Sequence, residues 1–109
     1  GKLSEGSEFL KKAGVLTPIA KAFSTNVSQI VTEIGVQVHG GMGYIEETGA
    51  AQFYRDARVT SIYEGTNGIQ AMDLVGRKMI DGGLAVKLLI EDIKDTEKLL
   101  FKELVTNHF

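Results

Sequence analysis

One long apolar stripe constrains the fold of this chain more than any other feature of its sequence. Its side chains recur at steps of three or four, which places them on one face of an α-helix; they are Ile19, Phe23, Val27, Ile30, Ile34 and Val38. Thr17-Pro18 predicts the start of this helix, because Thr caps free amides and Pro suits the first helical position. Gly40-Gly41 predicts its end.

Helical spacing also appears in four other segments, so the whole chain is predicted to be helical. These segments are residues 4–13, stopped by Gly14, then 47–62 as an interrupted helix, 66–79, and 84–105. Glu47 or Thr48 can support the start of the second, and Thr66-Asn67 can cap the third. Asp81-Gly82-Gly83 predicts where the third ends.

The expected fold class is all-α, an antiparallel helical bundle in one domain. No run of alternating apolar and polar residues is present, and a chain with 43% hydrophobic residues and a single proline is typical of globular proteins. Met72 and Met79 lie at apolar positions and are predicted to belong to the core.

Composition excludes several classes of function. A net charge of −2, with no cluster of Lys or Arg, argues against nucleic acid as a partner, and the lack of cysteine excludes thiolate chemistry. Apolar runs are too short for a membrane span, and the two histidines show no metal-ligand spacing, so no metal is expected. Because the chain begins with Gly1, we expect a processed product or an excised piece.

Two segments are unlike ordinary bundle sequence. In Gln37-Val38-His39-Gly40-Gly41-Met42-Gly43-Tyr44 the glycines allow positive φ or close approach of the backbone to another group, and a helix C-cap is the favoured interpretation. In the second segment Glu64 precedes Gly65 and the helix start at Thr66, beside the positive end of the helix dipole. From the residues alone, a structural loop carboxylate is favoured there over an anion-linked role.

Other charged groups have simpler interpretations. Glu46 and Glu47 form a possible acid and base pair but are more typical of ordinary charge before a helix. Arg55, Asp56 and Arg58 could clamp a phosphate, but we favour a structural ion-pair network for these residues.

Taken together, QVHGGMGY and RDARVTSIYEGTNGIQ resemble the C-terminal signature of acyl-CoA dehydrogenases. The match covers about residues 16–78, including Leu-Thr-Pro-x-Ala-Lys at 16–21. Residues 81–109 resemble an additional helix of one larger branch, which includes enzymes similar to 3-methylmercaptopropionyl-CoA dehydrogenase. The resemblance implies that the N-terminal helical domain and the middle β-domain lie outside this chain, which alone is expected to be inactive.

The resemblance also implies a chemistry. The full flavoprotein would oxidise an acyl-CoA to the trans-2-enoyl-CoA, with Glu64 removing the α-proton while the β-hydrogen leaves as hydride to FAD. A carboxylate in water is a weak base for this step, so substrate binding must expel water. In the family the backbone N–H of the base residue also binds the thioester carbonyl.

For the cofactor, Gln37, Gly40 and Gly41 match positions that contact FAD held mainly by a neighbouring subunit, which implies a homo-oligomer. Thr66 matches a contact to FAD of its own subunit, whereas Gly68 stands where the family often has Gln or Glu. Implied partners are the acyl-CoA substrate and an electron-transferring flavoprotein. The implied location is the cytoplasm if bacterial, or the mitochondrial matrix if eukaryotic. An acyl-CoA oxidase and a non-catalytic helical interaction or oligomerisation module are the alternatives.

Overall fold

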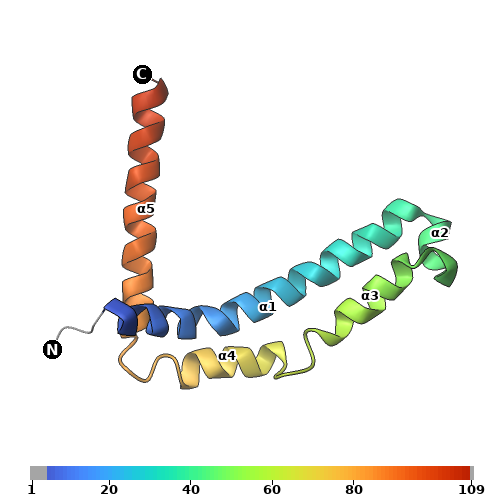
Figure 1. Ribbon diagram of the computed structural model, residues 1–109, viewed down its shortest axis with the longest axis horizontal. Helices are drawn as coiled ribbons and strands as arrows, with labels where there is room; N and C mark the ends of the chain where they lie inside the picture. Colours follow the sequence, from blue (N-terminus) through green and yellow to red (C-terminus); the bar gives the residue numbers. More distant parts are fainter. Residues whose placement is uncertain (1–4, 109) are drawn as a thin grey trace.

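The computed structural model describes residues 5–108, and within that range every regular element is a helix (Figure 1). In chain order these are α1 (Glu5–His39), α2 (Gly41–Tyr44), the short 3-10 helix η1 (Glu46–Thr48), α3 (Ala50–Val59), α4 (Asn67–Gly76) and α5 (Leu84–His108). The predicted all-α class is confirmed.

The chain folds back on itself as an open helical pair (Figure 1). One arm is α1, and α3 followed by α4 returns along it in the opposite direction, while α5 contacts α1 near its start and then turns away. The Cα radius of gyration is 19.8 Å, whereas a compact domain of this length has a value of about 13 Å. The helices are therefore antiparallel but do not enclose a thick core.

Helix α1 is continuous through Thr17-Pro18, so the predicted helix start there is wrong. Gly14 does not end a first helix either, and Ser4, the predicted first residue of that helix, lies outside the described residues. Pro18 has no N–H for the carbonyl four residues earlier, and the Thr17 hydroxyl donates to the Ala13 carbonyl at 2.8 Å instead of capping a new helix. Packing maintains the helix here, since Pro18 is buried and Val15 is only 2% exposed.

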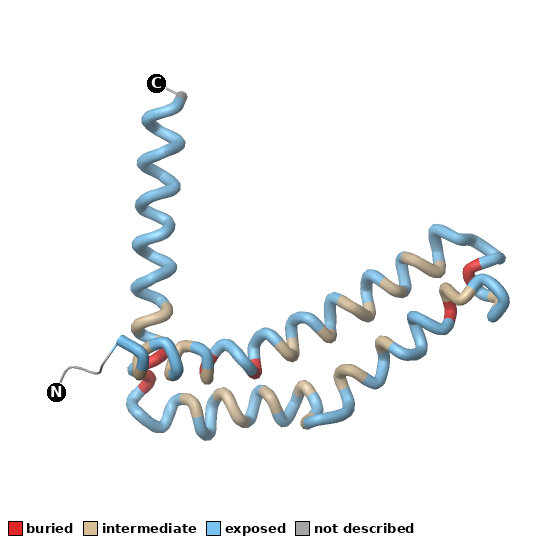
Figure 2. The backbone as a smooth tube through the Cα atoms, viewed as in Figure 1, coloured by how far each residue is buried: buried red, intermediate tan, exposed pale blue. Residues whose placement is uncertain are grey.

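The junction of α1 with α5 is one of the few buried places in the chain (Figure 2). Val15 and Ala85 lie in it, and Lys12 Nζ donates to Asp92 Oδ2 at 2.5 Å. Lys11 adds a longer ion pair to Asp81 at 3.7 Å. These contacts attach Asp81, in the turn before α5, and the first turns of α5 to α1.

The end of α1 agrees with the prediction from its glycines. Gly40 has φ 61° and ψ −141°, a combination that side chains disfavour, and its N–H donates to the Gln37 carbonyl at 3.0 Å. Gly43 is buried because α2 returns onto the last turn of α1. A Cβ at position 43 would lie 2.2 Å from the Val36 carbonyl oxygen, so this position requires glycine.

The helical segments after residue 46 differ from the prediction at their ends. Neither Glu47 nor Thr48 caps α3, whose N-cap is Gly49 in a left-handed conformation, and Thr48 instead donates its hydroxyl to the Met42 carbonyl. Helix α4 ends at Gly76, before Met79, and a run of turns reaches Gly83. Helix α5 continues three residues beyond the predicted Val105, to His108.

The apolar stripe of α1 points away from α3 and α4. All six of its residues are exposed, from Val27 at 38% to Val38 at 78%. The face of α1 that is partly covered carries small and polar residues instead, among them Thr25, Ser28 and Thr32, whose hydroxyls donate to carbonyls of α1. A wide apolar surface is thus left for a partner outside this chain.

Helix α4 repeats this arrangement, and the prediction that Met72 and Met79 belong to the core is wrong. Met72 is 74% exposed and Met79 is 42% exposed. Met72 lies on an exposed side of α4, and Met79 lies beyond the end of that helix, whereas the partly covered side of α4 includes Gln70 and Asp73. Figure 2 shows partial burial on the facing sides of the two arms, with buried positions at the junction of α1 with α5 and near α2.

Candidate active site

Glu64 lies in a tight turn between α3 and α4 with an uncommon backbone conformation. Its φ is 52°, the only positive φ at a non-glycine residue within 5–108, and Gly65 follows with φ 88°. Two successive residues with positive φ reverse the chain sharply. A residue with a Cβ adopts this left-handed conformation only when neighbouring groups compensate the strain. The turn therefore directs the Glu64 carboxylate by backbone geometry.

Hydrogen bonds from two helices hold this turn. Lys21 of α1 donates from Nζ to the Gly65 carbonyl at 2.6 Å, across 44 residues of sequence. Gln70, in the first turns of α4, donates from Nε2 to the Glu64 carbonyl at 3.3 Å. The shorter bond has a charged donor and a partly buried position, a combination that contributes about 1.5–3 kcal/mol in typical proteins.

The start of α4 is capped and attached to α1. Thr66 is its N-cap, as predicted, and its hydroxyl oxygen accepts from the Ile69 N–H at 3.2 Å. Asn67 is the first helical residue, and its amide donates to Asn26 Oδ1 at 2.8 Å, while its Oδ1 lies 3.2 Å from the Thr25 hydroxyl oxygen. The helix that follows Glu64 is thus fixed relative to α1.

The surroundings of Glu64 are open in this chain. Its side chain is exposed, as is that of Tyr63 at 51%. A shallow groove runs between α1 and the turn, and it is lined by Ala20, Lys21, Ser24, Thr25, Ser28, Thr60 and Tyr63. Glu64 precedes Thr66, the N-cap of α4, by two residues. Any dry environment for Glu64 has to come from groups outside this chain.

The residues predicted to contact FAD fall into two groups that the structure does not bring together. Gln37, Gly40 and Gly41 are exposed at the end of α1, before α3 begins, whereas Thr66 lies after α3 ends. Ten residues of helix, about 15 Å, separate the two ends of α3. Glu64 and Thr66 form one cluster, and the glycine turn forms another.

The remaining candidates form local contacts. Arg55 pairs with Glu46 at 3.7 Å, and Arg58 donates to the Ser61 hydroxyl at 2.6 Å. Asp56 and Arg58 form no ion pair within residues 5–108, so the predicted ion-pair network of these three residues is not formed, although the contacts of both arginines are local ones. His39 Nδ1 lies 2.8 Å from the Gly35 carbonyl, as expected of a polar residue at a helix end. Within the described part of the chain no three His, Cys, Asp or Glu side chains gather closely enough to hold a metal ion.

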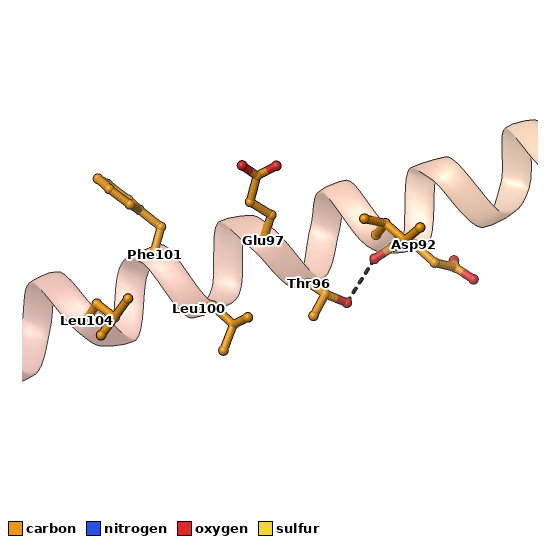
Figure 3. Close-up of a pocket in the computed structure, with 7 residues that line it drawn as sticks. Asp92, Thr96, Glu97, Leu100, Phe101 and Leu104 are labelled. Carbon is orange, nitrogen blue, oxygen red and sulfur yellow. Dashed lines mark hydrogen bonds between the residues drawn. The ribbon is translucent and has the colours of Figure 1, made fainter. Parts of the chain in front are cut away.

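The apolar depression on α5 is not part of this site (Figure 3). It is lined by residues of α5 alone, and these are Asp92, Ile93, Thr96, Glu97, Leu100, Phe101 and Leu104. The close-up shows Phe101 and Glu97 on one side of the helix and Leu100 and Thr96 on the other. It is the uncovered face of one helix. No helix among residues 5–108 is long and apolar enough to cross a membrane.

Sequence reasoning did not identify the residues that hold the Glu64 turn. Lys21 belongs to the Leu-Thr-Pro-x-Ala-Lys motif, which signalled a helix start and no contact to position 65. Gln70 closes the RDARVTSIYEGTNGIQ segment, so its place in a distinctive motif was the available signal. A contact over 44 residues cannot be deduced from periodicity, because periodicity assigns faces and not partners.

The family model and the curated relatives that match this chain indicate the same family. Residues 2–80 match the family described as acyl-CoA dehydrogenase, C-terminal domain. The chain is 53% identical over 97 residues to a 3-methylmercaptopropionyl-CoA dehydrogenase of Ruegeria pomeroyi, which covers 88% of this chain and 16% of that protein.

Shorter alignments link the chain to other members. It is 45% identical over 71 residues to a short-chain specific acyl-CoA dehydrogenase of Megasphaera elsdenii, covering 65% of this chain and 18% of that protein. It is 40% identical over 68 residues to a mitochondrial short-chain specific acyl-CoA dehydrogenase of Homo sapiens, covering 62% and 16%. The chain thus spans less than a fifth of the length of these relatives. Because most of the chain matches the family's C-terminal domain, it belongs to the acyl-CoA dehydrogenase family.

Proposed function

We propose that this chain is the C-terminal helical part of a FAD-dependent acyl-CoA dehydrogenase in which Glu64 is the catalytic base. The reaction is oxidation of an acyl-CoA thioester to the trans-2-enoyl-CoA. The observation that carries the proposal is the Glu64-Gly65 turn, which places a carboxylate directly before α4 and is held by Lys21 from another helix. Membership of a family whose relatives are named acyl-CoA dehydrogenases supplies the reaction class.

The chemistry assigned to Glu64 is removal of a weakly acidic proton from the α-carbon of the thioester. FAD, when bound, supplies the acceptor for the β-hydride. The carboxylate works as a base only when water is excluded, and since Glu64 is exposed in this chain, the other domains and the substrate must cover it. The Glu64 backbone N–H is proposed to donate to the thioester carbonyl, where negative charge develops as the proton leaves.

The residues present fit a role in holding FAD. A Cβ built at Gly40 or Gly41 meets nothing within 4 Å, so the backbone of this turn is open to a ligand, and the Gln37 side chain beside it is exposed. The Thr66 hydroxyl accepts one bond from α4 and keeps its proton for donation. Because Gln37, Gly40 and Gly41 match family positions that contact FAD held mainly by a neighbouring subunit, we assign them to that cofactor, and we assign Thr66 to FAD of the same subunit. The separation of the two groups by α3 is compatible with two different cofactor molecules.

We propose that the protein carries an N-terminal helical domain and a middle β-domain in addition to this segment. The proposed core of the C-terminal domain is residues 16–78, and residues 81–109, which include α5, are an addition found in the branch that includes the Ruegeria enzyme. The alignment with that enzyme supports this division, because its 97 residues exceed the part matched by the family description. The exposed stripe of α1 supports burial against those domains or against a second subunit of a homo-oligomer.

The proposed electron acceptor is an electron-transferring flavoprotein, and the substrate is an acyl-CoA. An acyl-CoA oxidase is the close alternative, and peroxide yield compared with reduction of the flavoprotein separates the two. The proposed location is the cytoplasm for a bacterial source or the mitochondrial matrix for a eukaryotic one. We propose neither a nucleic-acid partner nor a membrane span.

The thin core favours one competing function, a helical interaction or oligomerisation module without chemistry. Thirty large apolar side chains are exposed within the described chain, while three apolar residues are buried. Titration of the purified chain with FAD addresses this alternative. The dehydrogenase account expects little or no binding, because most of the flavin site lies in other domains, and tight stoichiometric binding by the isolated chain would contradict it.

A hybrid enzyme tests the proposed function. In it, this chain replaces the matching 97-residue segment of the Ruegeria pomeroyi enzyme, and 3-methylmercaptopropionyl-CoA is the substrate. The hybrid is expected to turn over, and Glu64→Gln is expected to lower kcat about 10²–10⁴-fold with flavin content unchanged. Glu47→Gln is the matched control, since Glu47 is an exposed carboxylate in η1. An inactive hybrid, or a Glu64→Gln variant with normal turnover, contradicts the proposal.

A further inference from the structure

The turn that carries Glu64 has to be held in place by other parts of the molecule. Glu64 and Gly65 have φ values of 52° and 88°, and a side-chain-bearing residue leaves this region readily when contacts are removed. A carboxylate that abstracts a proton must also stay within a small range of position, since a displacement of about 1 Å can slow a reaction about 100-fold. The groups that fix this turn therefore bear on catalysis.

Lys21 is the group outside α4 that bonds directly to the turn. Its bond to the Gly65 carbonyl is 2.6 Å long, whereas the two bonds that Gln70 donates to the carbonyls of Glu64 and Gly65 are 3.3 and 3.5 Å. Hydrogen bonds weaken with distance. Gln70 also belongs to α4, the helix that follows the turn, so Gln70 and the turn move together.

The charge of Lys21 is directed to this carbonyl. No carboxylate within the described part of the chain forms an ion pair with Lys21, whose ammonium group donates to the Gly65 carbonyl. Lys21 is half-buried beside the groove that runs along the turn, and its helix is fixed to the start of α4 by Asn26 and Asn67. The ammonium group is thus held at a fixed point relative to Gly65.

We propose that Lys21 is a positioning residue for proton abstraction, which it supports by holding the Gly65 carbonyl so that the adjoining Glu64 carboxylate keeps its place. This inference rests on the proposed function of Glu64. Lys21 itself transfers no proton and touches no reacting atom. Without its bond, the turn is held by the two longer bonds from Gln70, and the carboxylate samples a wider range of positions.

The test uses Lys21→Met in the hybrid enzyme, because Met keeps the apolar stem and removes the donor. The expected result is a kcat lowered about 10- to 100-fold, with KM and flavin content within about twofold of the unsubstituted hybrid. Lys21→Arg, which keeps a charged donor, is expected to recover most of kcat. Lys98→Met is the control, because it removes a lysine from an exposed pair with Asp95 on α5 and should change nothing.

A second measurement does not depend on turnover. Amide hydrogen exchange of Tyr63, Ile69 and Gln70, whose N–H groups are hydrogen-bonded on either side of the turn, is followed without substrate. It is expected to quicken in Lys21→Met and to stay unchanged in Lys98→Met. Normal kcat together with unchanged exchange in Lys21→Met overturns the positioning role, while loss of activity in Glu64→Gln still supports the proposed function. Loss of flavin or of folding in Lys21→Met and Lys21→Arg alike also overturns it, because Lys21 is then a structural residue.

Discussion

Lys21 and Gly65 lie 44 residues apart in sequence, and the Lys21 ammonium donates to the Gly65 carbonyl at 2.6 Å. This contact joins the long first helix to the turn that presents Glu64. It gives the candidate site a support that does not come from the loop itself. The predictions below follow from this turn, from the glycines around it and from the apolar surface left exposed.

The conformation of Gly65 makes it sensitive to substitution. At φ 88° a Cβ is strained, and it would lie 3.0 Å from Gln70 Nε2 and 3.3 Å from Ile69 Cγ2. We expect Gly65→Ala to destabilise the turn by about 1–2 kcal/mol and to lower kcat of the hybrid. Gly68→Ala, inside α4 with ordinary φ, is the control and should leave stability unchanged or higher. Equal effects at the two positions would contradict the geometry.

Gly43 is predicted to be the structurally demanding glycine of the QVHGGMGY segment. The Cβ of alanine would meet the Val36 carbonyl oxygen at 2.2 Å and His39 Cβ at 2.8 Å, which is possible only if α2 moves. Gly43→Ala should lower the free energy of unfolding of the chain by about 1–3 kcal/mol in urea titration. Gly41→Ala has open space around its Cβ and serves as the comparison. A tolerated Gly43→Ala would show that α2 does not pack as described.

Thr66 should contribute to stability as a helix cap. Its hydroxyl oxygen accepts the Ile69 N–H at 3.2 Å, and removal of such a cap costs about 1 kcal/mol. We expect Thr66→Ala to lower the unfolding free energy by that amount, whereas Thr66→Ser keeps the oxygen and should cost much less. Chemical denaturation of both variants measures the difference. Identical losses would indicate that the methyl group, rather than the cap, matters.

The isolated chain is expected to be only marginally stable and to self-associate. The stripe from Ile19 to Val38 is exposed, and Phe23 within it is 69% exposed. Association that covers such a surface makes the melting temperature rise with concentration. Sedimentation and thermal melts over a hundredfold range of concentration measure this, and Phe23→Glu with Ile30→Glu should reduce association. A high melting temperature that does not change with concentration would rule out this expectation.

The helices could largely be predicted from the sequence, whereas their partners could not. Gly40 ends α1 and Thr66 caps α4 as expected, because both effects are local. Thr17-Pro18 has the local signature of a helix start, yet buried contacts of Val15 and Pro18 carry the helix through it. Local propensity loses to tertiary packing at that position.

The direction of the apolar faces could not be deduced either. The spacing from Ile19 to Val38 correctly indicates one face of a helix, but periodicity does not say whether that face meets the same chain or another surface. The spacing of Met72 predicts a place in the core for the same reason, but the residue is exposed. The position of Glu64 before α4 was predictable from Gly65 and Thr66, while its support by Lys21 depends on how the helices pair.

The most direct test of the account follows the α-proton of a bound thioester. When the hybrid enzyme is incubated with 3-methylmercaptopropionyl-CoA in deuterated water, the account predicts that deuterium enters the α-position, and that Glu64→Gln slows this exchange by at least about 100-fold without loss of flavin or substrate binding. Exchange at the same rate in both proteins would contradict the assignment of Glu64 as the base.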